Sequence, residues 1–478
     1  MSIAHPLEQA STEATIEIRN PATGEVIDTV PRAGMEDVER VIEAGLKGRS
    51  EMRSLPAHRR SEILRKASDI IASRHEELSR LLCMENGKTI RQCRGEMTAT
   101  QRLFQDFSEE AKRIHGETIP MDAVAGLEHM IAYTIRQPIG LIVGIIPFNY
   151  PAELFAHKIP GALAAGNAAI VKLPEQCPLT VFELGRILIE AGLPPHGLQM
   201  ITGYPNEMGD RLLTHPEVGM ISFTGGLHSA RAIAKATAPH LKKTAYELGG
   251  VDAMFVLEDA NLAAAADAVV QGRLTNGAGQ ICCAVKRVLV AETVFDDFLV
   301  LLLKKVEGIK MGDPLDEQTD LGPLISEKAA ERVHREVLQC IEMGAKCLCG
   351  GTRRGTNFYT PTVLIDVSDE MPCMCGEVFG PVVPISPFKD IVSAIEEVNS
   401  SPYGLQASVF SENVHRVLGV AHRLQVGGVV VNGAGSFRPG NVPFGGFKLS
   451  GIGRESIKET IQEMTQETAI VLNQRQIL

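Results

Sequence analysis

Apolar residues recur at helical spacing through the first quarter of the chain. Residues 35–116 read as three long amphipathic helices, and within residues 61–82 the apolar side chains follow one helix face. Ahead of them, Asn20-Pro21-Ala22-Thr23-Gly24 predicts a turn between two strands, at residues 15–19 and 26–30. The pattern thus predicts a short pair of strands followed by a helical region.

From residue 139 onward, short apolar runs alternate with amphipathic stretches. We expect strands at residues 139–146, 168–173, 198–202 and 220–223, and helices at residues 151–165, 178–191, 206–214 and 230–238. Such alternation is typical of a parallel sheet covered by helices. A second series begins near residues 252–256 and runs to about residue 431. The sequence therefore predicts an α/β protein with two sheet domains, and a cleft between them is the expected place for an active site.

Two segments belong to neither series. Residues 117–136 read as an extended hairpin, and residues 467–472 read as a strand-like tail. Neither could bury its own backbone groups well, so either could pair with the edge of a partner subunit. Packing on the same chain is the alternative, and the residues alone leave both open.

Composition narrows the class of function. Of the 478 residues, 44% are apolar and 22% are charged, as in ordinary globular proteins. A net charge of −11 without a basic stripe argues against a nucleic-acid surface. No stretch approaches the roughly 18 to 20 apolar residues of a membrane span, and residues 1–20 lack the pattern of a signal peptide. We therefore expect a cytoplasmic protein that binds neither nucleic acid nor membrane.

The ten cysteines are scattered, which is typical of reduced intracellular thiols. Two close pairs, Cys347 with Cys349 and Cys373 with Cys375, raise the question of zinc. One residue separates the members of each pair, whereas structural zinc sites favour two to four, and no His pair follows. The alternation around Cys347 instead predicts a strand that runs into a turn. We therefore expect no metal site.

The run Asn276-Gly277-Ala278-Gly279-Gln280-Ile281-Cys282-Cys283 carries the clearest candidate chemistry. Small, flexible residues that lead to a cysteine can leave its thiol open to a substrate, and a thiolate attacks carbonyl carbon. Glu247 precedes paired glycines, which suggest a tight turn that aims its carboxylate into a cleft. Asn149 places an amide donor at the end of a predicted strand. These residues are candidates for a nucleophile, a general base and an oxyanion donor.

Seven motifs resemble those of the aldehyde dehydrogenase superfamily, in the family's order and over nearly the whole chain. They are Pro147-Phe148-Asn149-Tyr150-Pro151, Val171-Lys172-Leu173-Pro174-Glu175, Phe223-Thr224-Gly225-Gly226, Glu247-Leu248-Gly249-Gly250, Gly279-Gln280-Ile281-Cys282, Glu377-Val378-Phe379-Gly380-Pro381-Val382 and Pro443-Phe444-Gly445-Gly446-Phe447-Lys448. No single motif is specific, but seven in order are. The resemblance implies an aldehyde dehydrogenase-like fold with three parts.

By this resemblance, a Rossmann-like NAD(P)-binding domain comprises residues 1–116 and 138–247. An α/β catalytic domain comprises residues 248–450. A small β oligomerisation element comprises residues 117–137 and 466–478. Family members pair this element across dimers, often within tetramers, so the resemblance favours a homodimer or homotetramer.

The resemblance also assigns catalytic roles. Cys282 is implied as the nucleophile, with Cys283 as a rival that otherwise packs beside it or takes part in redox chemistry. Attack on an aldehyde creates an oxyanion, which the Asn149 amide and the Cys282 backbone N–H would stabilise. Hydride transfer leaves a thioester, and Glu247 would activate the water that cleaves it. The carboxylate of Glu247 speaks against the branch of the family that transfers the acyl group to coenzyme A.

Cofactor contacts follow from the same resemblance. Lys172, also a catalytic candidate, and Glu175 lie where the family binds the adenosine ribose, and a carboxylate there favours NAD, with NADP still possible. Gly225 and Gly226 would face the pyrophosphate at a helix N-terminus. Glu377 would hold the nicotinamide ribose. The other implied contacts are Phe148, Thr224, Leu248 and Phe379, the last of them near the nicotinamide ring.

The chain departs from the family pattern at two informative places. Gly226 stands where many members carry Ser, which removes a possible hydroxyl contact to phosphate. The interval from Glu247 to Cys282 is one residue longer than usual, through an extra glycine in residues 276–279. The geometry of this loop therefore does not follow from the family pattern.

The helix after Asn149 would place Tyr150, Leu154 and His157 on one face, which in the family lines the substrate tunnel. Together with Arg438 on a late loop, His157 indicates a tunnel of polar or cationic character. We therefore expect a small polar aldehyde, hydroxylated or carrying an anionic tail. The alternative is that His157 is a core histidine and Arg438 an ion-pair partner.

Two other functions remain open at this point. An enzyme of the same fold could pass the thioester to coenzyme A, and a protein of the same fold could serve a structural role without catalysis. The presence of Cys282, Glu247 and Asn149 disfavours the second of these.

Overall fold

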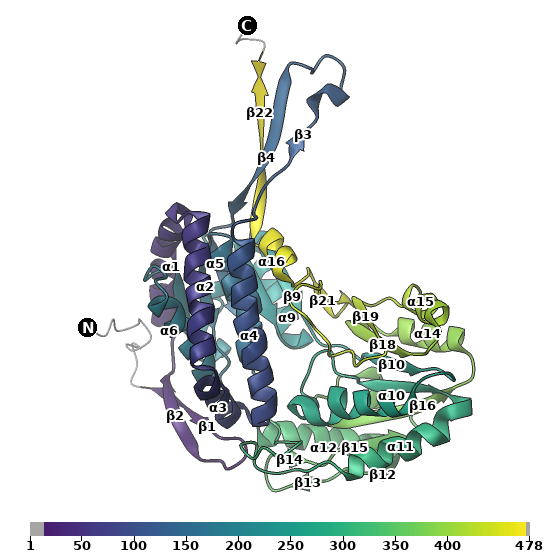
Figure 1. Ribbon diagram of the computed structural model, residues 1–478. Coiled ribbons are helices and arrows are strands. Elements are labelled where there is room, and N and C mark those ends of the chain that lie inside the picture. Colours follow the sequence, from purple (N-terminus) through teal and green to yellow (C-terminus); the bar gives the residue numbers. More distant parts are fainter. Residues whose placement is uncertain (1–13, 475–478) are drawn as a thin grey trace.

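A computed structural model describes residues 14–474, which form two sheet regions and a projecting β arm (Figure 1). Residues 1–13 of the predicted cofactor domain and residues 475–478 of the predicted oligomerisation element lie outside the described residues. The predicted α/β class with two mainly parallel sheets is confirmed. The predicted first pair of strands is present as β1 (Thr15–Arg19) and β2 (Val26–Pro31), which pair antiparallel.

Four helices, rather than the three predicted, follow this pair. They are α1 (Met35–Ser54), α2 (Ala57–Ser73), α3 (His75–Asn86) and α4 (Ile90–Glu110). Only Arg74 separates α2 from α3, and its backbone leaves the helical conformation at φ −103° and ψ 17°. A one-residue break of this kind does not interrupt the apolar periodicity, so the sequence pattern concealed it.

The first sheet has six strands in the order β21, β9, β8, β5, β6, β7. Their bounds are β21 (Gly451–Ile452), β9 (Lys243–Glu247), β8 (Met220–Thr224), β5 (Leu141–Ile145), β6 (Ala168–Lys172) and β7 (Leu198–Ile201). All but β21 run parallel. Strands β5 to β8 are almost wholly buried because helices cover both faces, which explains their continuous apolar runs.

The helices that connect these strands are α5 (Pro151–Ala164), α6 (Leu179–Glu190) and α9 (Leu227–Thr237). Instead of one predicted helix at residues 206–214 there are two short ones, α7 (Pro205–Met208) and α8 (Arg211–Thr214). Gly209 between them adopts a left-handed φ of 67°, which ends the first helix.

The second sheet has seven strands in the order β12, β15, β16, β11, β10, β18, β19. Their bounds are β12 (Lys346–Cys349), β15 (Thr362–Ile365), β16 (Val382–Phe388), β11 (Arg287–Ala291), β10 (Ala253–Val256), β18 (Gln406–Phe410) and β19 (Gly428–Val431). The covering helices include α10 (Leu262–Val269), α11 (Phe295–Glu307), α12 (Glu327–Glu342), α14 (Ile391–Ser400) and α15 (Val414–Ala421). The series predicted from residue 252 to about 431 is confirmed, as is the strand at Cys347.

The two segments left outside both series pair with each other. Strand β22 (Thr465–Asn473) runs antiparallel along the whole of β4 (Met130–Pro138), and β3 (Thr118–Ile119) pairs with the other edge of β4. This three-stranded arm projects from the body of the molecule (Figure 1). Within the chain the hairpin thus pairs with the tail, and most of β22 remains exposed.

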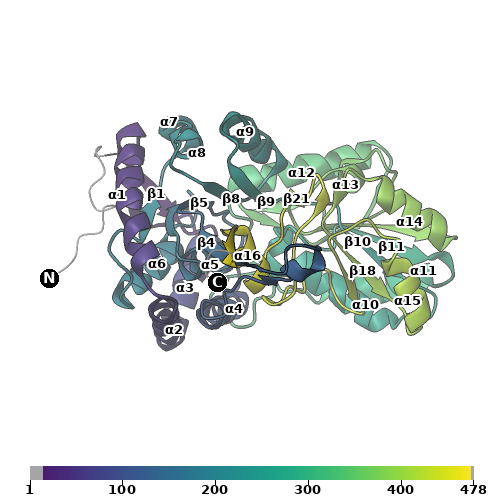
Figure 2. The same ribbon diagram turned by 90° about the horizontal axis from the view of Figure 1, so that it is seen from above.

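The chain crosses between the two sheet regions near its C-terminus. After β19 it returns to pair β21 with β9, and α16 (Ile457–Glu463) then packs against α5. Seen from above, α1, α2 and α6 lie on one side of the molecule and α10, α11, α14 and α15 on the other, with α16 between them (Figure 2). Among residues 14–474, no helix is both long and apolar enough to cross a membrane.

Candidate functional site

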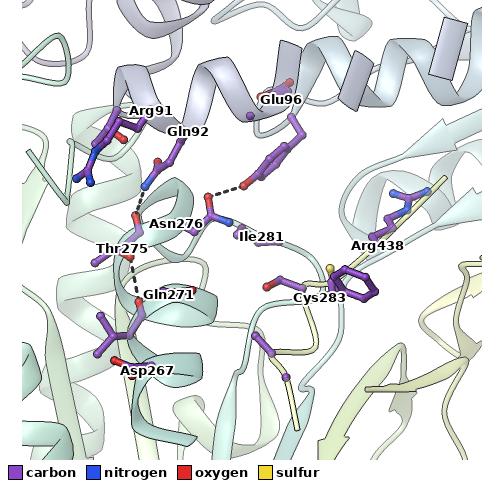
Figure 3. A pocket seen from close by; sticks show the side chains of 18 of the residues that line it. Arg91, Gln92, Glu96, Asp267, Gln271, Thr275, Asn276, Ile281, Cys283 and Arg438 are labelled. Carbon is purple, nitrogen blue, oxygen red and sulfur yellow. Dashed lines mark hydrogen bonds between the residues drawn. The ribbon is translucent and has the colours of Figure 1, made fainter. Parts of the chain in front are cut away.

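A cavity of about 1210 Å³ opens between the two sheet regions (Figure 3). Its wall is formed by α4, the start of α5, residues 267–283 and the loop at residues 430–438. Five of the residues predicted from the sequence line it, together with Cys283. They are Asn149, Tyr150, Leu154, Cys282 and Arg438. The structure therefore brings the candidate nucleophile and the candidate oxyanion donor to one cavity.

The two adjacent cysteines differ in environment. Cys282 is half-buried, whereas Cys283 is buried. A hydrogen bond from the Cys283 thiol lowers the pKa of Cys282 to about 7, aided by the charges of Arg438 and Lys286 and opposed by burial. The same pairing raises the pKa of Cys283 well above its usual range. Because the thiolate is the nucleophile, Cys282 is the more reactive of the two near neutral pH.

The loop before the nucleophile accommodates its extra residue through left-handed backbone. A π-helical turn (Val270–Thr275) leads into a tight turn (Asn276–Gly279), in which Gly277, Ala278 and Gly279 have φ values of 54°, 50° and 72°. A Cβ atom on Gly279 would lie 2.3 Å from the carbonyl oxygen of Gly380, so glycine is required there.

A glutamine that the sequence did not single out holds this loop. Gln92 on α4 donates from Nε2 to the carbonyl oxygen of Thr275 at 3.2 Å and accepts at Oε1 from the N–H of Gly277, also at 3.2 Å. Figure 3 shows Gln92 pointing from α4 toward Thr275. Tyr150 donates its hydroxyl to Oδ1 of Asn276 at 2.7 Å. Gln92 is one of several polar residues on an amphipathic helix, and nothing in its local sequence marks it.

The candidate oxyanion donor rests on a buried ion pair. Lys88 donates from Nζ to the backbone oxygen of Asn149 at 2.7 Å and pairs with the carboxylate of Glu96. Its Nζ also lies 3.9 Å from the centre of the Tyr150 ring. Glu96 in turn accepts the N–H of Ala152 at 3.0 Å in the first turn of α5. These contacts fix the backbone at Asn149, and the sequence analysis missed both members of the pair.

Glu247 ends strand β9 and is buried, although it does not line the cavity. Burial raises its pKa well above the usual range, and the nearby Glu455 raises it further, while Arg438 and Lys158 oppose both effects. The charge of Cys282 also raises the pKa of Glu247. Among residues 14–474, Oε2 of Glu247 has no hydrogen-bond partner. Once it is deprotonated, a buried carboxylate with a raised pKa is a stronger base than an exposed one and can take a proton from water.

Behind Glu247 lies a buried cluster of ion pairs. Lys158 and Arg438 both bind Glu455, with Nη2 of Arg438 2.7 Å from Oε2 of Glu455. The guanidinium of Arg438 also lies 3.9 Å from the centre of the Phe444 ring. Burial works against ionisation of Glu455, but the two cations hold its pKa at about 2. Arg438 is therefore an ion-pair partner as well as a residue of the cavity wall.

The paired glycines after Glu247 serve close packing rather than a left-handed turn. Neither Gly249 nor Gly250 has a positive φ. A Cβ atom on Gly249 would lie 2.0 Å from Oε2 of Glu377, so the backbone here touches that carboxylate. The crowding at Gly249 comes from a segment 128 residues away in the chain (377 − 249), so the local sequence does not reveal it.

The cofactor candidates gather at the carboxyl ends of the first sheet. From β5 the chain proceeds to β6 and β7 on one side and later to β8 and β9 on the other, so the strand order reverses between β5 and β8. Open α/β sheets bind ligands at such a point. Strand β5 leads to Phe148, and β8 ends at Thr224, followed by Gly225 and Gly226.

The local geometry fits a dinucleotide. Oγ1 of Thr224 is buried and has no hydrogen-bond partner among the described residues. Gly226 caps α9, and a Cβ atom there would meet no atom within 4 Å, which leaves the N-terminus of this helix open. The rings of Phe148 and Phe379 meet edge to face at 6.0 Å. Lys172 is hydrogen-bonded to Glu175.

His157 was expected on the tunnel wall, but it is not among the residues that line the cavity. It is 1% exposed, and its Nε2 lies 3.8 Å from Oε1 of Glu153. Seven residues advance a helix by about 10 Å, which carries His157 past Tyr150 and Leu154 into the core. Burial and the charge of Arg438 lower the pKa of His157, so it is neutral at pH 7. The cationic character expected of the tunnel therefore does not come from this residue.

The cavity wall carries charges of both signs. Glu153, which the sequence analysis did not consider, lines it together with Arg438. Other charged lining residues are Arg91, Glu96, Asp267, Lys304, Lys305 and Asp320. Such a wall suits a polar substrate better than a long apolar one. Among residues 14–474, no group of three or more His, Cys, Asp and Glu side chains is arranged to hold a metal ion.

Comparisons with known proteins agree with this arrangement. The sequence model of the aldehyde dehydrogenase family matches residues 8–470. The 3-sulfolactaldehyde dehydrogenase of Priestia megaterium is 40% identical over 98% of this chain and 96% of its own length. The lactaldehyde dehydrogenase of Methanococcus aeolicus is 35% identical over 96% and 97%. A glyceraldehyde-3-phosphate dehydrogenase from Methanocaldococcus jannaschii, solved with NADP, superposes with a TM-score of 0.92 at 35% identity, over 97% of this chain and 100% of that one.

Proposed function

The chain belongs to the aldehyde dehydrogenase family, and from this membership we propose that it oxidises a small polar aldehyde to the carboxylate with NAD(P)+ through a thioester on Cys282. Membership makes the protein an NAD(P)-dependent aldehyde dehydrogenase. The observation that carries the residue assignment is the half-buried Cys282 thiol, with a pKa of about 7, in a cavity that it shares with Asn149.

The first step is attack of the Cys282 sulfur on the aldehyde carbon. A sulfur–carbon bond forms, and the carbonyl oxygen takes up negative charge. The Asn149 side-chain amide and the backbone N–H of Cys282 donate to this oxygen. The ion pair of Lys88 and Glu96 supports this role, because it fixes the backbone at Asn149 before the substrate arrives.

A dinucleotide bound at this site would supply the acceptor for the hydride that leaves the former aldehyde carbon. Lys172 and Glu175 would hold its adenosine ribose, Glu377 its nicotinamide ribose, and the open N-terminus of α9 its pyrophosphate. Lys172 ends β6 and α9 follows β8, so both lie beside β5 where the strand order reverses, which supports this assignment. Both NAD and NADP are compatible with the family.

Glu247 removes a proton from the water that cleaves the thioester. Its raised pKa means that the deprotonated, active fraction grows as the pH rises above the usual range of a glutamate. Transfer to coenzyme A is the competing fate of the thioester. Product analysis with and without coenzyme A distinguishes hydrolysis of the thioester from this transfer. We expect the free acid to form at the same rate whether or not coenzyme A is present. Formation of an acyl-coenzyme A would contradict the hydrolytic reaction.

The substrate that we propose is a short aldehyde with a hydroxyl or anionic group. The relatives named above are a 3-sulfolactaldehyde and a lactaldehyde dehydrogenase, both named for short hydroxylated aldehydes. Arg438 lines the cavity, and its guanidinium carries a positive charge there. This guanidinium can therefore offer a donor to a polar tail.

A substrate panel tests this choice. We expect hydroxylated and sulfonated short aldehydes to have higher kcat/KM values than apolar aldehydes of equal length. Arg438→Gln should reduce that preference by about tenfold, the effect of one lost charge-assisted hydrogen bond. Arg186→Gln is the control, because Arg186 on α6 also lies over an aromatic ring but has an exposed side chain. Preference for long apolar aldehydes, unchanged by Arg438→Gln, would contradict the proposal.

The catalytic cysteine itself requires a separate test. We expect Cys282→Ser to lose essentially all NAD(P) reduction, because a serine hydroxyl is not ionised at pH 7, while Cys283→Ser keeps at least a substantial part of it. If both variants lost NAD(P) reduction to a similar extent, the result would contradict the assignment of Cys282 as the nucleophile. Full activity of Cys282→Ser would refute the whole mechanism.

We also propose that the three parts of the chain have the functions implied by its family. Residues 1–116 and 138–247 bind the cofactor, residues 248–450 carry the thiol, and the arm at residues 117–137 and 466–478 joins subunits into a homodimer or homotetramer. Exposed apolar side chains on the arm support this: Ile119, Ile131 and Val471 are 40%, 41% and 54% exposed. Light scattering of Val471→Asp should show smaller assemblies than wild type. All ten cysteines are free, which suits a cytoplasmic location.

A further inference from the structure

A buried lysine joins three parts of the proposed active site. Lys286 lies four residues after Cys282 and just before β11, and it is 1% exposed. Its Nζ donates to the carbonyl oxygen of Cys282 at 2.6 Å, to Oε1 of Glu377 at 3.0 Å and to the carbonyl oxygen of Gly250 at 3.2 Å. An ammonium group has three N–H donors, so all of them are used.

Each acceptor belongs to a different functional segment. Cys282 is the proposed nucleophile, Gly250 lies in the segment that directly follows Glu247, and Glu377 is the proposed ligand of the nicotinamide ribose. These segments come from separate stretches of the chain, and no other single side chain described above contacts all three. We infer that Lys286 is a positioning residue that holds the nucleophile, the segment after the general base and the ribose carboxylate in one arrangement. This inference rests on the proposed function.

Glu377 in the proposed cofactor site is the counter-ion of Lys286. Asp252 is the other nearby carboxylate, and its backbone oxygen accepts the N–H of Lys286 at 2.9 Å. Burial raises the pKa of the Asp252 carboxyl to about 8, although Lys286 opposes this shift. At neutral pH Asp252 is therefore mainly uncharged, which leaves Glu377 to balance the lysine. This pairing links the segment of the nucleophile to the proposed cofactor site.

The lysine also acts on the electrostatics of the thiol. The thiolate of Cys282 is favoured by three nearby groups, those of Cys283, Arg438 and Lys286. It is opposed by three carboxyl groups when they are charged, those of Glu247, Asp252 and Glu377. Removal of Lys286 subtracts one cation and also frees Glu377, so both changes disfavour the thiolate.

The experiment compares Lys286→Met with wild type in full-length protein. The variant keeps a long unbranched side chain but loses the charge and all three donors. The readouts are the pH dependence of Cys282 alkylation by iodoacetamide, with the labelled peptide identified by mass spectrometry, and KM and kcat for NAD. Lys242→Met is the matched control, because Lys242 also donates to two backbone carbonyls, those of His215 and Val218, away from the cavity.

We expect Lys286→Met to shift the alkylation midpoint upward by about half a pH unit or more, to raise KM for NAD and to lower kcat by about tenfold or more. Lys286→Arg should keep the alkylation midpoint near that of wild type, because it restores the charge. If Lys286→Met does not fold, Lys286→Gln replaces it with the same readouts. The inference would be overturned if the neutral variant, Lys286→Met or Lys286→Gln, had the same alkylation midpoint and the same KM for NAD as Lys242→Met.

The outcome is separable from that of the proposed function. Full activity of Cys282→Ser would refute the function and, with it, the role of Lys286. An inactive Cys282→Ser together with an unaltered Lys286→Met would refute only the role of Lys286.

Discussion

Replacement of Glu247 by glutamine separates the chemistry of this site from its stability. The carboxylate is buried at the end of β9, and its Oε2 has no partner among the described residues. Glutamine has nearly the same size and shape but cannot ionise. The substitution therefore removes the proposed base, which should lower activity. It also removes a buried charge, which should raise stability.

The loss of the base should be large. General base catalysis by a positioned carboxylate contributes about 10²- to 10⁴-fold, so steady-state turnover of Glu247→Gln should fall by a factor in that range. Formation of the thioester does not require Glu247. We therefore expect rapid mixing to show a burst of NAD(P)H of about one equivalent per active site, followed by slow turnover.

The effect on stability follows from the raised pKa of Glu247. A carboxyl group with a higher pKa in the folded than in the unfolded state binds its proton more tightly when folded. Its contribution to stability is complete below the unfolded pKa and is lost as the pH rises toward the folded pKa. The loss is up to about 1.4 kcal/mol for each pH unit that separates the two pKa values. Glutamine mimics the protonated group, so the gain in stability of Glu247→Gln over wild type should be smaller at pH 5 than at pH 8.

Urea unfolding at pH 5 and pH 8 measures this difference, with Glu258→Gln as the control. Glu258 forms an exposed ion pair with Arg416, and loss of that pair should cost no more than about 1 kcal/mol. The reasoning is refuted if Glu247→Gln shows no burst, or if its gain in stability is the same at both pH values.

Three further substitutions test the supports of the site. Gly279→Ala should destabilise the fold by several kcal/mol and abolish activity, because it adds a clash to the roughly 1–2 kcal/mol cost of left-handed backbone. Gly355 is the control, because it has a φ of 60° but a Cβ atom there would meet no atom within 4 Å. In the same urea titration, Gly355→Ala should therefore show the backbone cost alone. Lys88→Met should cost about 3–5 kcal/mol by leaving Glu96 buried without its cation, and the added change Glu96→Gln should recover most of that loss; no recovery would contradict the pairing. Gln92→Leu should lower the rate of thioester formation, measured as the burst rate, by about tenfold through displacement of the nucleophile loop. An unchanged burst rate would show that the loop does not depend on this glutamine.

The sequence was most informative where structure depends on neighbours along the chain. The strands at residues 141–145 and 168–172 and the helix at residues 151–164 follow from local apolar periodicity, which the tertiary fold preserves. The same pattern could not separate α2 from α3, because one non-helical residue leaves the phase of the apolar face unchanged.

Contacts between segments that are distant in the chain could not be predicted from any local sequence pattern. His157 has the helical spacing of a tunnel residue, yet packing buries it beyond the cavity. Arg438 looked like a cation for a substrate, and the fold pairs it with Glu455. Gln92 lies in no motif that could have identified it from sequence reasoning alone.

The amino-acid sequence by itself determined the α/β class, the order of the strands and helices, and the family to which Cys282, Glu247 and Asn149 point. The tertiary structure alone decided which side chains surround the thiol and what charge each of them carries. The reason is physical: periodicity and motifs are properties of adjacent residues, whereas pKa values and hydrogen-bond partners depend on burial and on groups that only folding brings together.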